Sequence, residues 1–318
     1  MRSMVFDEVF AVLSHLPLRT DELARLRSWL AAIIHPGECL ALIAREAGVP
    51  PCPRCHGARV HRCGCASGLQ RFRCCNCGRS YNALSGTPLA RLRHKEKWLP
   101  YLQCVLESRT VRDAATVTSV HRTTSFRWRH RFVRGAMHER AEQLTAIVEA
   151  DETYLLESQK GARLMNRPPR KRGGVASFRG ISREHDCLLV ARDRGRQTLD
   201  FHVGRGPVTA LQLTQCLAPV LAGDALLISD AAQAYRSFAR QAGISHEAVN
   251  IRAGIRARGA IHVQNVNGWH SRFKTWLRRF NGVASRYLFA YSGWQRILDD
   301  GRLTTAASLL RAAVRCRQ

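Results

Sequence analysis

Two Cys-x-x-Cys pairs, close to each other in the sequence, constrain the fold of this chain more than any other feature. The four cysteines are Cys52, Cys55, Cys74 and Cys77. Two such pairs offer four thiolates, and each two-residue spacer lets the backbone turn around an ion. This is the pattern of a closed, tetrahedral structural Zn²⁺ site. A strand-like stretch at 69–73 and a glycine at 78 flank the second pair, so we predict a zinc ribbon.

The same segment holds three further cysteines, Cys63, Cys65 and Cys75, which leave room for an exchange of ligands. The alternative to a metal site is a set of buried thiols. The chain has 12 cysteines over 318 residues. In a reducing compartment this number favours metal ligands and buried thiols over a disulfide framework.

The charge of the chain indicates a polyanionic partner. It has 50 Lys and Arg against 24 Asp and Glu, a formal net charge of +26, and the excess lies after residue 50. A field of this sign concentrates nucleic acid, with an anionic membrane surface or a merely solvated basic face as alternatives. No apolar run reaches the ~18 residues needed to span a bilayer, and the start of the chain is acidic, unlike a signal peptide. We therefore expect an intracellular protein that neither spans nor binds a membrane.

Two helical regions precede the main domain. Apolar residues recur every three and four positions over 5–47, which predicts a small helical cap whose role the sequence does not indicate. A second pattern covers 97–134: an apolar helix at 98–106, a short helix capped by Thr110, a turn at 117–120 and a basic helix at 121–132. The spacing from Ala115 to Ser119 and Val120 is typical of a helix-turn-helix. The predicted DNA contacts on the basic helix are Arg122, Thr123, Thr124, Arg127, Arg129 and Arg131. The alternative is a helical hairpin with a solvated basic face.

From residue 145 the pattern changes to that of a mixed sheet with flanking helices. We predict strands at 147–154, 185–191, 198–203, 225–230 and 246–251, and helices at 209–217 and 232–240. The first two strands are joined by a long basic loop that contains Lys171 and Arg172, which we add to the predicted DNA contacts. The chain is thus predicted to be a multidomain α+β protein whose main domain has a mixed five-stranded sheet.

Two aspartates occupy conspicuous positions on these strands. Asp151 lies on the first strand and Asp230 ends the fourth. If the strands are neighbours, both carboxylates reach one edge of the sheet and can share Mg²⁺, which prefers oxygen ligands. Two such ions about 4 Å apart would activate a water or a 3′-hydroxyl in phosphodiester chemistry. A helix cap and a surface salt bridge are the alternative roles. In the later segment 262–274, Asn267 and Lys274 are separated by two helical turns and so share one face.

The order of these features resembles the insertion-sequence transposases of the DDE type, in particular their ISXO-like branch. The resemblance covers about residues 50–300, from the zinc ribbon through the helix-turn-helix, Ala-Asp-Glu-Thr-Tyr and Ile-Ser-Asp to the segment 262–274. It implies an RNase H-like catalytic domain that cuts and joins double-stranded DNA at terminal inverted repeats and in a target. Two Mg²⁺ ions, replaceable by Mn²⁺, and a homo-oligomer on DNA in the bacterial cytoplasm, associated with the nucleoid, are also implied.

The resemblance also assigns roles to residues. Asp151 and Asp230 match the first two catalytic positions, Asn267 falls on the third, where Glu is frequent, and Lys274 would hold a phosphate. An amide oxygen can ligate a hard cation, although it brings no charge and cannot act as a base. Reserve ligands are Glu149, on the same strand face as Asp151, and His262.

We therefore expect five regions: a helical cap at 1–48, a zinc ribbon at 49–90, a helix-turn-helix at 91–142, a catalytic domain at 143–300 and a C-terminal helix at 301–318. The leading hypothesis is a transposase. The alternatives are a non-catalytic DNA-binding regulator derived from one, and an RNase H-like nuclease that does not join strands.

Overall fold

The computed structural model describes residues 11, 15–23, 26, 36–171, 173–249, 254 and 257–317. The chain divides into two compact units, of which the first comprises Met1–Ser85 and Arg91–Trp128 and the second Gly86–Ala90 and Arg129–Gln318. In the described part of the chain, no helix has both the length and the apolar character needed to cross a membrane. Residues 5–10, 12–14, 24, 25 and 27–35 of the predicted N-terminal helical region, and the predicted DNA contact Arg172, lie outside the described residues.

The first unit contains a small antiparallel sheet whose interior is largely sulfur and aromatic. The strands are β1 (Val60–Ala66), β2 (Leu69–Cys74) and β3 (Ser80–Asn82), and the helix α3 (Pro36–Ala47) precedes them. The rings of Phe72 and Tyr81 lie 5.9 Å apart and pack with Cys52 and Cys74. The Tyr81 hydroxyl donates a hydrogen bond of 2.7 Å to the carbonyl of Pro50. So few apolar residues form this interior that the cysteines are a main part of it.

Three helices follow in the same unit, close to the predicted boundaries. They are α4 (Trp98–Leu106), which a short 3-10 turn η1 (Lys95–Lys97) precedes, α5 (Val111–Val117) and the start of α6 (Arg122–Ala136). Thr110 caps α5, as predicted, and forms with Asp113 the reciprocal hydrogen bonds of a capping box. Ser119, in the turn before α6, has a left-handed backbone with φ of 49°. The rings of Trp98 and Tyr101 pack edge-on against Trp128, with centroids 6.5 and 5.2 Å away, and tie α4 to α6.

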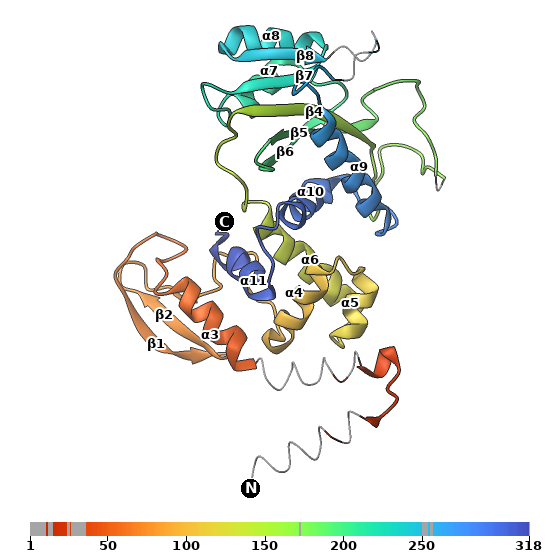
Figure 1. Ribbon diagram of the computed structural model, residues 1–318. Helices are drawn as coiled ribbons and strands as arrows, with labels where there is room; N and C mark the ends of the chain where they lie inside the picture. Colours follow the sequence, from red (N-terminus) through yellow and green to blue (C-terminus); the bar gives the residue numbers. More distant parts are fainter. Residues whose placement is uncertain are drawn as a thin grey trace. The chain divides into compact units, whose positions relative to one another are not determined.

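The second unit is built on a five-stranded mixed sheet in the order β6-β5-β4-β7-β8 (Figure 1). β5 is antiparallel to β4 and β6, whereas β7 is parallel to β4 and β8. The strands are β4 (Ile147–Leu156), β5 (His185–Asp193), β6 (Thr198–Arg205), β7 (Leu226–Asp230) and β8 (Ser245–Val249). The predicted mixed five-stranded sheet is confirmed, as is the α+β class.

Helices cover both faces of this sheet. Their bounds are α7 (Ala210–Leu217), α8 (Gln233–Ala242), α9 (Gln264–Arg278) and α10 (Ser285–Asp299). A further helix of the second unit, α11 (Ala306–Arg315), lies against α6. Val148 and Ala150 of β4 pack in one apolar core with α7 and α8. Because successive side chains of a strand point to opposite faces, the residues between them face the other way, where α9 contacts β4 and β5. This alternation decides which side chains of β4 reach the site described below.

The aromatic residues of α10 belong to the core. Tyr291 and Trp294 of α10 are buried, and their rings pack edge-on at 5.4 Å. In α6, Gly135 lies so close to α11 that an added Cβ would stand 2.6 Å from the Cα of Ala313. Only glycine permits this approach of two helix backbones.

Candidate functional site

The four cysteines of the paired motifs meet at one point. The Sγ atoms of Cys52, Cys55, Cys74 and Cys77 all lie within 4.8 Å of one another, and they form the one such group found among the described residues. Two of the Sγ–Sγ distances are 3.6 Å (Cys52 to Cys77) and 3.5 Å (Cys55 to Cys74). Ligands about 2.3 Å from a tetrahedral Zn²⁺ stand roughly 3.8 Å apart, so the donor set and its spacing fit zinc. Cys63, Cys65 and Cys75 are not part of the group.

Local backbone geometry favours a thiolate at Cys52, one member of this cluster. Burial acts to raise the pKa of Cys52, but N–H groups of the turn at Cys55 and Arg54 point at its sulfur and outweigh that effect. The resulting pKa is lowered to about 6. A thiolate is the form of cysteine that binds metal. The same turn that the two-residue spacer predicts thus also supplies the electrostatics of the ligand.

Sheet register brings Asp151 and Asp230 to matching positions on adjacent strands. In the parallel pair β4 and β7, Ile147 lies opposite Leu226, Val148 opposite Leu227 and Glu149 opposite Ile228. In each pair the two residues are the same number of positions apart in the sequence. Asp151 and Asp230 are also that number of positions apart. Continuing this register past its last recorded pair therefore places Asp151 beside Asp230, the final residue of β7.

The electrostatics of Asp151 reflect this proximity. Burial raises the pKa of its carboxyl to about 6; the backbone N–H of Glu152 opposes the rise, the charge of Asp230 adds to it, and Lys274 opposes it. The next residue, Glu152, also has its pKa raised, to about 7, first by burial and further by the charges of both aspartates. Its side chain lies on the other face of the sheet, where it accepts a hydrogen bond from the hydroxyl of Tyr235 in α8. Three carboxyl groups therefore influence one another at this position of the sheet.

Glu149 has a different role from the reserve metal ligand that its position on β4 suggested. Its carboxylate is 0% exposed and accepts hydrogen bonds from the backbone N–H groups of Asn265 (2.7 Å) and Val266 (3.0 Å), in the first turn of α9. The side-chain amide of Asn265 donates a third, of 2.6 Å. A carboxylate at a helix N-terminus satisfies donors that have no partner inside the helix. Glu149 thus fixes the start of α9 on the sheet.

The second reserve ligand, His262, belongs to the same arrangement. Its Nδ1 lies 3.4 Å from Glu149 Oε1, and the guanidinium of Arg194 stands 3.1 Å from the same oxygen. These protein groups occupy the oxygens of Glu149. We therefore do not assign Glu149 or His262 as a metal ligand.

The position of α9 decides what faces Asp151. His270 is buried, and its Nδ1 lies 3.7 Å from Oδ2 of Asp151. Burial, and then the charge of Lys274, lower the pKa of His270 to about 3, so the ring is neutral near pH 7. Asn267 lies on the exposed side of the same helix and, within the described residues, its side chain makes no hydrogen bond with either aspartate. The charges of Asp230 and Lys274 therefore both act on Asp151. The structure adds His270, which the sequence analysis missed. Its spacing of one helical turn from Asn267 was a signal that could have identified it.

The predicted DNA contacts of α6 do not share one surface. Arg122, Thr123 and Arg127 are exposed and Thr124 is half-buried. Arg129 is 0% exposed, and its guanidinium lies over the ring of Trp294 at 4.9 Å. The expectation that Arg129 contacts DNA is therefore wrong, because it lies on the core side of the helix. Arg131 is exposed but donates a hydrogen bond of 2.9 Å to the carbonyl of Pro88.

A basic hollow of about 390 Å³ adjoins the exposed face of α6 within the first unit. Its lining includes Arg91, Arg93, His94, Thr124 and Arg127, and no acidic residue. Sequence reasoning did not single out the two arginines before α4. Their proximity to α6 depends on the packing of the segment after β3, which no local pattern reveals.

Comparison with known proteins finds a family model that matches part of the second unit. Residues 143–294 match the family model of the ISXO2-like transposase domain, which confirms the resemblance inferred from the sequence motifs. A relative from Halobacterium salinarum, "Uncharacterized protein in transposable element ISH50", is 27% identical over 248 residues, 76% of this chain and 82% of the relative. The chain is also similar to a solved chain described as "Crystal structure of a pre-cleavage Mos1 transpososome", at 14% identity over 65% of this chain and 77% of that one. The TM-score of 0.22 is too low for that likeness to carry an argument.

Proposed function

We propose, from the premise that residues 143–294 form an ISXO2-like transposase domain, that this protein is an insertion-sequence transposase acting on its element's terminal inverted repeats. The observation that supports the catalytic part of the proposal is the parallel register of β4 and β7, whose continuation past Glu149 and Ile228 would bring Asp151 next to Asp230. The strand order and directions are those expected of an RNase H-like domain, the fold implied by the resemblance.

The donor set at this position suits a hard divalent cation. Asp151, Asp230 and the side-chain oxygen of Asn267 would hold Mg²⁺ or Mn²⁺, since such ions prefer oxygen ligands. When bound, a pair of ions would activate the attacking oxygen and stabilise the leaving oxygen of a phosphodiester. Lys274, whose charge already reaches Asp151, would bind a phosphate oxygen of the strand being cut. The neutral ring of His270, 3.7 Å from the Asp151 carboxylate, would restrict the room for that side chain on the α9 side by packing.

The first unit would supply recognition of DNA. α4 to α6 would act as a helix-turn-helix in which Arg122, Thr123, Thr124 and Arg127 meet the major groove. The basic hollow beside α6 would take a backbone phosphate. Its position next to base-reading side chains is typical of contacts that set the register of a protein on its site. The cysteine cluster would hold Zn²⁺ as a structural ion, and two element ends would be brought together by at least a dimer on DNA.

The test is cleavage of a labelled terminal repeat by the full-length protein with Mg²⁺ or Mn²⁺. We expect nicks with 3′-hydroxyl ends and, with target DNA present, joined products. Asp151→Ala should eliminate both while leaving DNA binding unchanged, and Asp224→Ala, outside the site, should leave both intact. Nicks that persist in Asp151→Ala would contradict the assignment.

The uncharged Asn267 favours one second candidate, a non-catalytic DNA-binding regulator. An amide at the third position lowers the negative charge available to cations and removes a base. The same assay separates the two functions, since a regulator would bind the terminal repeat and give no nicks with either metal. Nicks without joined product would instead indicate a nuclease.

A further inference from the structure

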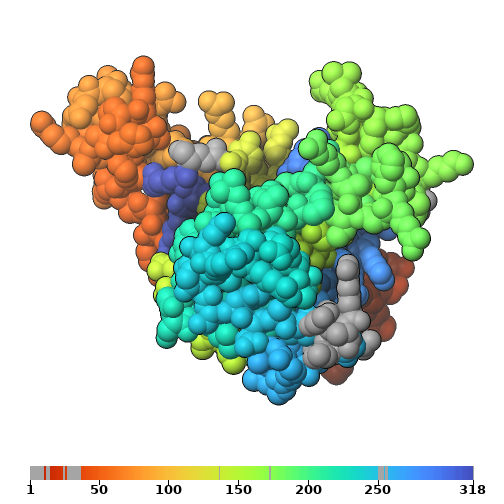
Figure 2. All heavy atoms as spheres, turned by 90° about the horizontal axis from the view of Figure 1, so that it is seen from above, coloured from red at the N-terminus to blue at the C-terminus, as the bar shows by residue number. Residues whose placement is uncertain are grey.

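The loop between β4 and β5 is basic along its whole length. From 158 to 183 the sequence contains eight Lys and Arg and no Asp or Glu. In Figure 2 the light green residues of this loop form a lobe that stands out from the second unit. A long loop with such a composition keeps one conformation only if contacts with the rest of the domain hold it, and the structure contains such contacts.

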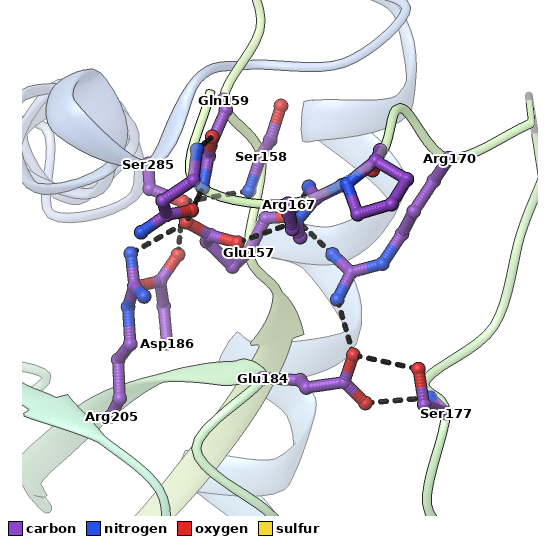
Figure 3. Close-up of polar contacts among 12 residues, drawn as sticks. Glu157, Ser158, Gln159, Arg167, Arg170, Ser177, Glu184, Asp186, Arg205 and Ser285 are labelled. Atoms are coloured by element: carbon purple, nitrogen blue, oxygen red, sulfur yellow. Dashed lines mark hydrogen bonds and ion pairs between the residues drawn. The ribbon is translucent and has the colours of Figure 1, made fainter. Parts of the chain in front are cut away.

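Buried and half-buried polar bonds hold the loop at several points along its course (Figure 3). Glu157, at the end of β4, is 6% exposed and pairs with Arg167 at 2.9 Å and with Arg205 at 2.7 Å. Arg170 donates both to the carbonyl of Glu157 and to Glu184, each at 2.7 Å. The loop is thus fixed to both strands that it connects.

The beginning of the loop is also attached to the end of α9. Nζ of Lys160 donates to the carbonyls of Asn281 (3.0 Å) and Gly282 (3.1 Å), just past the last turn of that helix. Ser158 and Ser285 exchange hydrogen bonds at the start of α10. The loop therefore has a defined place beside α9, the helix that faces Asp151.

Fixed in this way, the loop presents apolar side chains to solvent. Leu164, Val175 and Phe178 are 92%, 84% and 70% exposed, and Met165 and Ile181 are also exposed. These are five of the ten large apolar residues found exposed in the described part of the chain, within a short stretch. Exposed apolar groups gathered on a tethered segment mark an interaction surface.

Basic residues surround these apolar groups. Arg163, Lys171, Arg179 and Arg183 are exposed, and none of their side chains makes a hydrogen bond or ion pair in the parts of the chain that the structure describes. The acidic residues at the base, Glu157 and Glu184, are already paired with arginines. The described outer surface of the loop therefore combines cationic and apolar side chains and carries no acidic residue.

We propose that the loop at 159–183 binds DNA whose bases are locally unpaired, with Phe178, Val175 and Ile181 against base faces. The cations that would contact phosphates are Arg163, Lys171, Arg179 and Arg183. A second copy of the chain is a poorer occupant because it carries the same +26 charge. The apolar side chains need a surface that duplex DNA hides, namely the face of a base, which becomes accessible only when the base leaves its stack. The inference rests on the proposed transposase function and specifies the state of the DNA that this function handles.

A track on α9 connects this loop with the catalytic edge. Asn267, Ser271, Lys274 and Arg278 are all exposed and follow one another at helical spacing on one face. Together they span about 16 Å of helix. The helix begins where Glu149 caps it and ends where Lys160 binds the following turn. DNA lying along this face would pass from Asp151 to the loop.

Binding of full-length, zinc-loaded protein to two versions of one labelled DNA tests the proposal. One version is a perfect duplex and the other carries a short run of mismatched base pairs. We expect wild-type protein to bind the mismatched DNA about 10-fold more tightly, since an unstacked base can stack on the ring of Phe178. Phe178→Ala should remove this preference and leave the affinity for the duplex within about twofold. Leu211→Ala, which truncates a side chain 67% exposed on α7, should keep it.

Photocrosslinking from position 178 identifies the occupant independently of affinity. With benzoylphenylalanine in place of Phe178, irradiation should attach the protein to the mismatched strand. Crosslinks to a second protein chain in place of DNA, or an unchanged preference in Phe178→Ala, would overturn the proposal while leaving the transposase function standing. Failure of the intact protein to bind either DNA would remove both. An unchanged melting temperature of Phe178→Ala verifies that the fold is retained.

Discussion

The cysteine cluster and the aspartate pair are both candidate metal sites, but they are assembled in opposite ways. The cysteines come from one short stretch of the chain, Cys52–Cys77, and their sheet has a small apolar interior of its own. Asp151 and Asp230 are far apart in the sequence and are placed by a large sheet with helices on both faces. We infer that the first region depends on its ion for structure, whereas the second holds its ligands with or without an ion.

The sharpest test of this contrast is removal of zinc. A structural zinc site supplies on the order of 10 kcal/mol of folding free energy, so a chelator, or Cys74→Ser, should unfold residues 49–85. The second unit should remain folded and keep its own melting transition. Zinc content and proteolysis measure the outcome. Cys75→Ser, which lies outside the cluster, should keep one zinc per chain; loss of zinc in that variant would contradict the ligand assignment.

The next effect concerns chemistry at the aspartate pair. Asn267→Ala should lower the rate of strand joining by roughly 10²–10³-fold, the usual effect of removing one electrostatic contact to a reacting group. Asn267→Glu should retain joining and require less Mg²⁺. Gln264→Ala, at an exposed position on the same helix, serves as the control. Full joining by Asn267→Ala would remove this residue from the site.

The anchoring of α9 should contribute less. Glu149→Ala leaves the first-turn N–H groups of α9 and the guanidinium of Arg194 without their buried partner, so we expect a loss of about 3 kcal/mol of unfolding free energy in urea. Glu247→Ala breaks an exposed pair with Arg258 and should cost less than about 1 kcal/mol. Equal effects of the two substitutions would show that Glu149 does not hold the helix.

The smallest effect separates the two regions by their response to acid. Burial, aided by the charges of Arg129 and Arg286, lowers the pKa of His130 to about 4 in the second unit. The unfolded chain binds this proton near pH 6.5. Above that pH the neutral, buried ring therefore makes its full contribution to the free energy of unfolding. This contribution is lost progressively as the pH falls from 6.5 towards 4. His130→Gln should flatten this part of the stability curve. An unchanged curve would show that another group causes the acid sensitivity.

Local features of the second unit were predictable because they follow from short-range patterns. The strand ending at Asp230 was indicated by an apolar run that stops at a carboxylate, and in the first unit the cap of α5 was indicated by Thr110. The helical period could also have corrected one error. Ser125, Trp128 and Phe132 define the buried side of α6, and Arg129 falls on that side while Arg127 does not.

The sequence by itself determined which four cysteines cluster, the order of strands and helices, and that two strands carry an aspartate. These features follow from residue spacing and hydrophobic period, which are properties of neighbouring residues. Only the tertiary structure decided that Glu149 caps α9, that His270 faces Asp151, and that the basic loop is tied down with its apolar side chains outward. These outcomes depend on strand register and on contacts between segments far apart in the chain. They are selected by the packing of the whole domain, which no local pattern encodes.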